Sequence, residues 1–246
     1  LLIHGGGAQK TLANVHYVTL NLAGSALFLF ALGIMYGTFG TLNMADMQQK
    51  AALINPNDVR LANAGAMLLL VVFGLKSAML PLHFWMPRAY SAAPAPVAAL
   101  FAIMTKVGIY SLWRVHCGIF GDNAGDLANI AQPWLWPLAW LTVVIGIIAT
   151  LASKTLRELT ANLVIISVGS LLLMVALNTR EATASGLYYL VHSTLATALM
   201  FLVAGLIIGQ RGKAEDRFVQ ARPVVQPALL GALFFLAALA LIGMPP

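Results

Sequence analysis

Three ionisable side chains, Lys76, Lys106 and His192, lie inside apolar stretches of the sequence. Lys76 is part of LLVVFGLKSA at residues 69–78, and Lys106 lies near the middle of ALFAIMTKVGIY at residues 99–110. A lysine at the centre of a bilayer costs roughly 2.5–3.5 kcal/mol on insertion scales. Proteins retain such a charge where it faces a partner or a wet cavity, so we expect both lysines to serve a function.

A buried lysine is suited to proton transfer. Desolvation disfavours the charged ammonium and a nearby carboxylate restores it, so a buried lysine–acid pair is a proton switch under electrostatic control. No acidic residue lies inside the predicted spans, since Glu158 stands at a helix entrance. The partner carboxylate is therefore expected outside this chain or on another subunit. The alternative is snorkelling to the headgroups, which suits Lys76 better than the central Lys106.

His192 lies in a polar stretch of another apolar segment. Tyr188 and Tyr189 precede it by four and three residues, so both can border its face of a helix. Because small environmental changes move a histidine across neutrality, His192 is a candidate proton relay. The alternative is a neutral imidazole that joins helices beside Ser193 and Thr194.

Further residues are candidates for proton access: His83, Tyr110 and Tyr188. His83 follows Lys76 by seven residues, which puts both on one helix face if the helix continues through Pro81. An interfacial anchor beside Trp85 is an equal alternative for His83.

Prolines interrupt two of the apolar segments. Pro81, placed within a helix, would free the carbonyl of Ser77, and Pro245 interrupts the last segment in the same style. Two proline-broken helices in corresponding positions are typical of inverted-repeat transporters. Two unrelated helix ends would give the same pattern.

The composition sets the class of protein. Of the 246 residues, 60% are hydrophobic and 9% are charged, whereas soluble domains carry about a quarter charged residues. This excludes a soluble globule, a disordered chain and a nucleic-acid-binding protein. A single cysteine, Cys117, excludes a thiolate metal site within the chain, and the histidine spacing matches no zinc motif. We therefore predict no metal and no cofactor.

The hydropathy pattern predicts an all-α integral membrane protein with about seven spans, forming one domain over residues 1–246. A span needs roughly 20 mainly apolar residues. The predicted spans are 18–40, 61–82, 96–115, 134–152, 159–178, 184–208 and 225–246. The chain begins without Met and ends within an apolar segment, so we expect a fragment of a larger bundle, truncated at both ends.

Lysine and arginine are distributed unequally between alternate connections. The richer set comprises Lys10, Arg88, Lys154, Arg157, Arg211, Lys213, Arg217 and Arg222. The poorer set comprises Lys50, Arg60, Arg114 and Arg180. The positive-inside rule places the richer set in the cytoplasm.

One long motif resembles a known family. The segment GLKSAMLPLHFWMPRA at residues 74–89, followed by APAPV at 93–97 and KVGIY at 106–110, is similar to the proton-antiporter membrane subunits. These include the large subunits of Mrp/Pha cation/proton antiporters and the antiporter-like subunits of respiratory complex I. The segments at 16–27, 40–46 and 188–195 resemble the D subunit of the Mrp/Pha antiporter more closely. The RELTAN sequence at 157–162 departs from the complex I relatives.

The resemblance implies roles for the buried groups. It covers the middle of a fourteen-helix unit, in which a seventh-helix lysine pairs with a fifth-helix glutamate and an eighth-helix lysine relays protons toward the twelfth helix. Lys76 matches the first lysine, Lys106 the second, and His192 the family's relay histidine. The glutamate would lie before Leu1 and the twelfth-helix group after Pro246.

The expected function is therefore a non-enzymatic, proton-translocating subunit of a multisubunit Na⁺ or K⁺/proton antiporter. It would be multi-pass in a prokaryotic cell membrane, with other antiporter subunits as partners. The alternative is an antiporter-like subunit of a redox-driven pump, such as complex I or a membrane-bound hydrogenase. A passive scaffold is disfavoured, because a scaffold gains nothing from central lysines.

Overall fold

A computed structural model describes residues 8–220 and 223–243. This part of the chain is helical, with no sheet and a single bridging pair, Thr155 with Arg217. The α-helices are α1 (Ala8–Phe39), α2 (Met44–Ala51), α3 (Val59–Ser77), α4 (Trp85–Ala92), α5 (Ala95–Leu112), α6 (Gln132–Leu151), α7 (Leu156–Leu177), α8 (Arg180–Arg211) and α9 (Pro227–Ile242). A π-helix, η1 (Trp113–Ile119), extends α5 directly, and short 3₁₀ turns precede α6 and follow α8.

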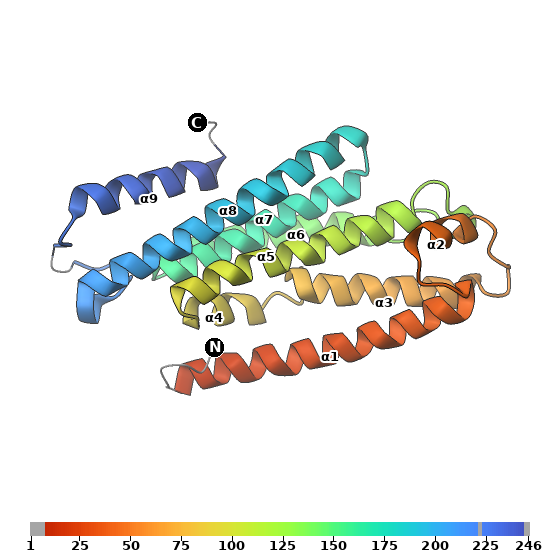
Figure 1. The fold of residues 1–246 in the computed structure, drawn as a ribbon, viewed down its shortest axis with the longest axis horizontal. Helices are drawn as coiled ribbons and strands as arrows, with labels where there is room; N and C mark the ends of the chain where they lie inside the picture. The colour runs from red at the N-terminus through yellow and green to blue at the C-terminus, as the bar shows by residue number, and fades with distance from the viewer. Residues whose placement is uncertain (1–7, 221–222, 244–246) are drawn as a thin grey trace.

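The long helices run side by side along one axis, and short connections alternate between the two ends of the bundle (Figure 1). Helix α2 lies at one end, beside η1, and α4 lies toward the other. The described members of the lysine- and arginine-rich set fall at the α4 end, and the poorer set falls at the α2 end. The predicted alternation of connections is therefore confirmed.

Six helical segments are long and apolar enough to cross a membrane. They are Thr11–Phe39, Val59–Ser77, Ala95–Ile119, Gly125–Leu151, Leu156–Leu177 and Arg180–Ala214. Helix α9, the counterpart of the seventh predicted span, is apolar over 16 residues of the described chain. The all-α membrane fold class is confirmed.

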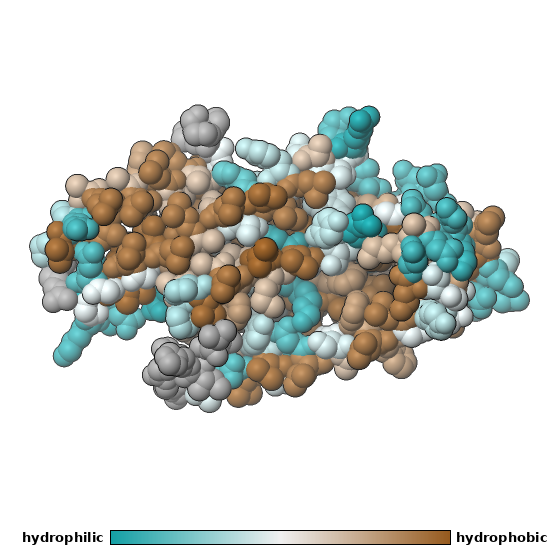
Figure 2. Space-filling view, viewed as in Figure 1, coloured by the Kyte–Doolittle hydropathy of each residue, from teal (hydrophilic) through white to brown (hydrophobic). Residues whose placement is uncertain are grey.

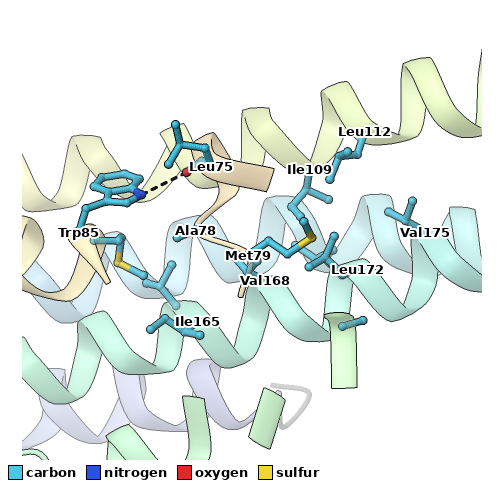
Figure 3. Packing of buried hydrophobic residues seen from close by; sticks show 14 of the residues in the cluster. Leu75, Ala78, Met79, Trp85, Ile109, Leu112, Ile165, Val168, Leu172 and Val175 are labelled. Atoms are coloured by element: carbon cyan, nitrogen blue, oxygen red, sulfur yellow. Dashed lines mark hydrogen bonds between the residues drawn. The ribbon is translucent and has the colours of Figure 1, made fainter. Parts of the chain in front are cut away.

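The centre of the bundle is α7, the most buried of the candidate spans. It packs against α4, α5, α6 and α8, and supplies Ile165, Val168, Leu172 and Val175 to the main core cluster (Figure 3). On the face shown in Figure 2, apolar side chains cover much of the surface, and polar residues are most concentrated toward the ends. Such a distribution fits a bundle surrounded by lipid, in which the helices satisfy their own backbone polar groups.

Helix α3 ends five residues earlier than the sequence predicts. Ala78 adopts a left-handed conformation with φ of 60°, and the Met79 amide donates to the Gly74 carbonyl at 2.9 Å. This is the hydrogen-bond pattern that closes helix C-termini. The interpretation of Pro81 as a residue within the helix is therefore wrong: Pro81 follows the helix end and lies in the turn that leads to α4.

Candidate functional site

Lys106 is sealed inside the bundle. Its side chain is 1% exposed, and its Nζ donates to the Ser167 hydroxyl of α7 at 3.0 Å. Helix α5 carries it inward because the adjacent positions on that face, Thr105 and Ile109, are also fully buried. A neutral hydroxyl satisfies one of the three ammonium donors and supplies no countercharge.

Lys76 occupies a more open position, one residue before the end of α3. It is half-buried, and its Nζ donates to the Asn21 side-chain oxygen of α1 at 2.7 Å. Asn21 is fixed in turn, because its amide nitrogen donates to the Tyr17 carbonyl at 2.8 Å. The negative end of the α3 dipole also favours a cation in the last helical turn.

A groove of about 300 Å³ opens beside Lys76, between α1, α3 and α5. Its lining is mainly apolar, with Ser25 and Ser111 as the other polar members alongside Lys76. Lys106 does not line it. The two lysines therefore differ in access as well as in burial.

Gly108 brings the helices of the two lysines into direct contact. A Cβ at this position would lie 2.8 Å from the Ser77 backbone nitrogen and 3.1 Å from the Lys76 carbonyl carbon. A side chain there would push α5 away from the end of α3. The glycine, two residues after Lys106, thus permits the backbone approach that places both lysines in one region.

The helix break beside Lys76 is closed by protein groups. Trp85 of α4 donates its Nε1 hydrogen to the Leu75 carbonyl at 3.1 Å, as the dashed line in Figure 3 marks. The Thr142 hydroxyl of α6 accepts from the Leu80 amide at 3.0 Å. The sequence predicted a free Ser77 carbonyl at this point, but the early end of α3 moves the helix-terminal carbonyls to Gly74 and Leu75.

Neither lysine forms an ion pair within residues 8–220 and 223–243. The ion pairs found there join Lys50 to Asp46, and Arg157 to Glu215 and Asp216. A buried ammonium without a countercharge is costly. The expectation of a carboxylate from elsewhere is consistent with this geometry.

His192 lies where α8 meets α9. Its Nε2 lies 2.7 Å from the Ala240 carbonyl oxygen. Because a carbonyl can only accept, Nε2 carries the hydrogen, and Nδ1 of a neutral ring is left as the acceptor. The Tyr188 ring stacks on His192 with centroids 6.2 Å apart, as the helical spacing predicted.

The accessory candidates are scattered. Tyr110 and Tyr188 are exposed on α5 and α8. His83 lies in the turn before α4. Because α3 does not continue through Pro81, His83 and Lys76 do not share one helix face. Pro245 lies outside the described residues.

The sequence-based prediction missed two residues that hold the lysines, Asn21 and Ser167. Asn21 could have been found from the sequence, because an amide side chain within an apolar run is uncommon and usually bonds to another polar group. Ser167 could not have been found in this way, since a lone serine between apolar residues can bond to its own helix backbone.

The fold and these buried groups define a polytopic helical membrane protein with ionisable side chains held inside its bundle. Over residues 1–246 the sequence matches the family model described as NADH:quinone oxidoreductase/Mrp antiporter, transmembrane, and the chain belongs to this family. The resemblance found in the motif is confirmed.

Two curated relatives are named as antiporter subunits. The D subunit of a probable K⁺/H⁺ antiporter of Rhizobium meliloti is 40% identical, and the D subunit of the Na⁺/H⁺ antiporter of Bacillus subtilis is 36% identical. Each match covers 100% of this chain and 49% of the relative. The chain thus spans about half the length of the curated relatives it matches.

Solved structures give the same fold. A chain of the Mrp complex from Dietzia sp. DQ12-45-1b superposes with a TM-score of 0.79 at 25% identity, covering 97% of this chain and 43% of that one. A chain of respiratory complex I from Thermus thermophilus superposes with a TM-score of 0.84 at 27% identity, covering 99% of this chain and 51% of that one.

Proposed function

We propose that this chain is the central part of a proton-translocating subunit of a multisubunit Na⁺ or K⁺/proton antiporter. Protons pass through Lys76, Lys106 and His192. The subunit acts as a secondary transporter rather than an enzyme, together with other antiporter subunits, in a prokaryotic cell membrane.

The observation that carries the proposal is the sealed ammonium of Lys106 in a membrane helix, bonded to a neutral hydroxyl. A structural lysine would be expected to pair with an acid or to reach the headgroups. A group whose charge depends on a movable partner can instead release and regain a proton.

Lys76 is placed so that a neighbouring acid can control its charge. It lines a groove that a carboxylate-bearing helix can approach, and α3 meets the backbone of α5 at Gly108. Approach of an acid would stabilise the Lys76 ammonium, and withdrawal would favour release of its proton. Because α3 and α5 are in contact, Lys106 lies on the neighbouring helix for onward transfer.

The alternative is a subunit of a redox-driven pump, favoured by the similarity to complex I. The same lysines would serve the same path, but electron transfer would drive it. The relatives named as antiporter subunits favour the antiporter. Proteins that copurify distinguish the two: small hydrophobic antiporter partners, or iron–sulfur and flavin proteins.

The test is Lys76→Ala in the full-length protein within its complex, assayed for cation/proton exchange in inverted membrane vesicles. We expect exchange to fall at least about 100-fold, the lower range of what a positioned proton-transfer group contributes. Lys50→Ala on the exposed surface of α2 is the control and should exchange normally. Normal exchange by an assembled Lys76→Ala complex would refute the proposal.

A further inference from the structure

Helix η1 holds three buried ring nitrogens that no described residue satisfies. They are Nε1 of Trp113 and both nitrogens of His116. Trp113 is 6% exposed and His116 is 4% exposed. A neutral imidazole carries one donor and one acceptor, so both of its functions lack a partner within the described part of the chain.

Such groups are costly without partners. An unsatisfied buried donor or acceptor costs about as much as its full desolvation, and buried water usually bonds to groups of this kind. Trp85 of α4, the other buried tryptophan among the described residues, illustrates the contrast, because its Nε1 donates to the Leu75 carbonyl. Trp113 and His116 therefore share a feature that points to a small polar ligand.

The backbone and the neighbouring cavity favour the same ligand. Residues 113–119 form a π-helix, a widened turn that recurs at functional sites. A cavity of about 510 Å³ adjoins it, lined by Trp113 and Cys117 together with the polar Gln48, Asn178 and Thr183. Water can thus reach one side of η1 from the α2 end of the bundle.

The position relative to Lys106 suggests a role. His116 follows Lys106 by ten residues along α5 and η1, which corresponds to about 15 Å of helix rise. That is about half the thickness of a bilayer core, the distance from mid-depth to the surface. Among the charged groups at this end, Asp46 pairs with Lys50 on α2, Asp122 accepts from the Asn129 amide, and Arg114, which lines the cavity, donates to the Met44 sulfur.

We infer that η1 binds water at Trp113 and His116, and that His116 passes protons between Lys106 and the aqueous face at the α2 end of the bundle. This rests on the proposed function. The imidazole takes a proton at one nitrogen and gives up the proton of the other, so the net charge of the ring is restored after each transfer. Bound waters bridge the distance to Lys106, which exceeds the reach of a direct hydrogen bond.

The first test uses the wild-type complex and needs no variant. Radiolytic hydroxyl footprinting in ¹⁸O-labelled water, read by mass spectrometry, marks side chains beside bound water. We expect labelled oxygen on His116 and Trp113, and much less on Trp85, which is also buried but is bonded to protein. Labelling of Trp113 and His116 no higher than that of Trp85 would overturn the inference.

The second test measures exchange in vesicles with the full complex. His116→Gln keeps a hydrogen-bonding side chain but cannot cycle a proton, and we expect about a tenfold or greater loss of exchange. His16→Gln, an exposed histidine on α1, is the control and should exchange normally. Normal exchange by His116→Gln would overturn the relay. If Lys76→Ala and Lys106→Arg also exchange normally, the proposed function itself fails.

Discussion

The two lysines of this bundle lie in contrasting surroundings. Lys106 is buried in the middle of an unbroken helix and bonds to a hydroxyl, whereas Lys76 lies at a helix end, half-buried, beside a groove. The helix terminus and the Asn21 oxygen favour the Lys76 ammonium, and the groove lets another group approach it. Lys106 also has one neutral acceptor, the Ser167 hydroxyl, but its helix continues into η1 and offers no helix end to favour a cation. The difference indicates that an approaching acid can control the charge of Lys76, whereas Lys106 is placed to pass protons onward.

Local structure explains this contrast. The helix of Lys76 ends because Ala78 closes it, and Trp85 then bonds to a carbonyl of the last turn. The helix of Lys106 continues into η1 without interruption. The end of α3 leaves carbonyl groups free to accept hydrogen bonds and leaves a groove beside Lys76, whereas the continuous helix packs tightly around Lys106. The same residue type can therefore serve two steps of one path.

Among substitutions of the residues that hold the two lysines, the largest effect is expected from Asn21→Asp. It places a permanent carboxylate where the amide oxygen now lies 2.7 Å from Lys76 Nζ. An adjacent acid stabilises the lysine ammonium, so proton release and exchange should slow about 10–100-fold. Exchange in vesicles measures this, with Asn14→Asp on the same helix as the control. Unchanged exchange would show that Lys76 need not deprotonate.

A smaller effect is expected from Ser167→Ala. It removes the hydroxyl that accepts from Lys106 and leaves a buried donor unpaired, at a cost of about 1–3 kcal/mol. The melting temperature of the complex should fall, and exchange should drop several-fold. Ser170→Ala, whose hydroxyl bonds to its own helix backbone, is the matched control. Equal effects of the two substitutions would argue against a specific role for Ser167.

The smallest predicted effect is on the pH dependence of stability, and it comes from His83, which lies outside the membrane-spanning segments. Burial lowers the pKa of His83 below its ordinary value of 6.5. The unfolded state then binds more protons, so His83 contributes stability above pH 6.5 that is lost as the pH falls through its lowered pKa. Melting temperatures should fall in acid less steeply for His83→Gln than for the wild type. Parallel pH profiles would contradict this.

Much of the fold could be predicted from the sequence, because lipid leaves few choices for a spanning backbone. Long apolar runs predicted the helices, and the unequal distribution of lysine and arginine predicted which connections share an end of the bundle. The end of α3 could not be placed, since the proline at 81 suggested a break several residues after the real one. A left-handed alanine at position 78 carries no sequence signal, as this conformation is typical of glycine or asparagine.

The candidate site was predicted in part. Lys76, Lys106 and His192 stand out because a charged or titratable group in an apolar run is costly. Their partners Asn21, Ser167 and the Ala240 carbonyl depend on which helices pack together, and no local pattern encodes that. His116 was overlooked because it lies near a predicted span end, where a histidine is ordinary. Its burial, at 4% exposed, depends on how η1 packs within the bundle, which the local sequence does not encode.

The most direct test of the account is proton flux in vesicles that contain the assembled complex with Lys106→Arg. Arginine keeps the positive charge at that position but does not release its proton in proteins. We predict that exchange is lost in this variant, while Lys50→Arg on the surface exchanges normally. Wild-type flux through Lys106→Arg would show that a fixed charge suffices at this position, and would contradict a proton path through Lys106.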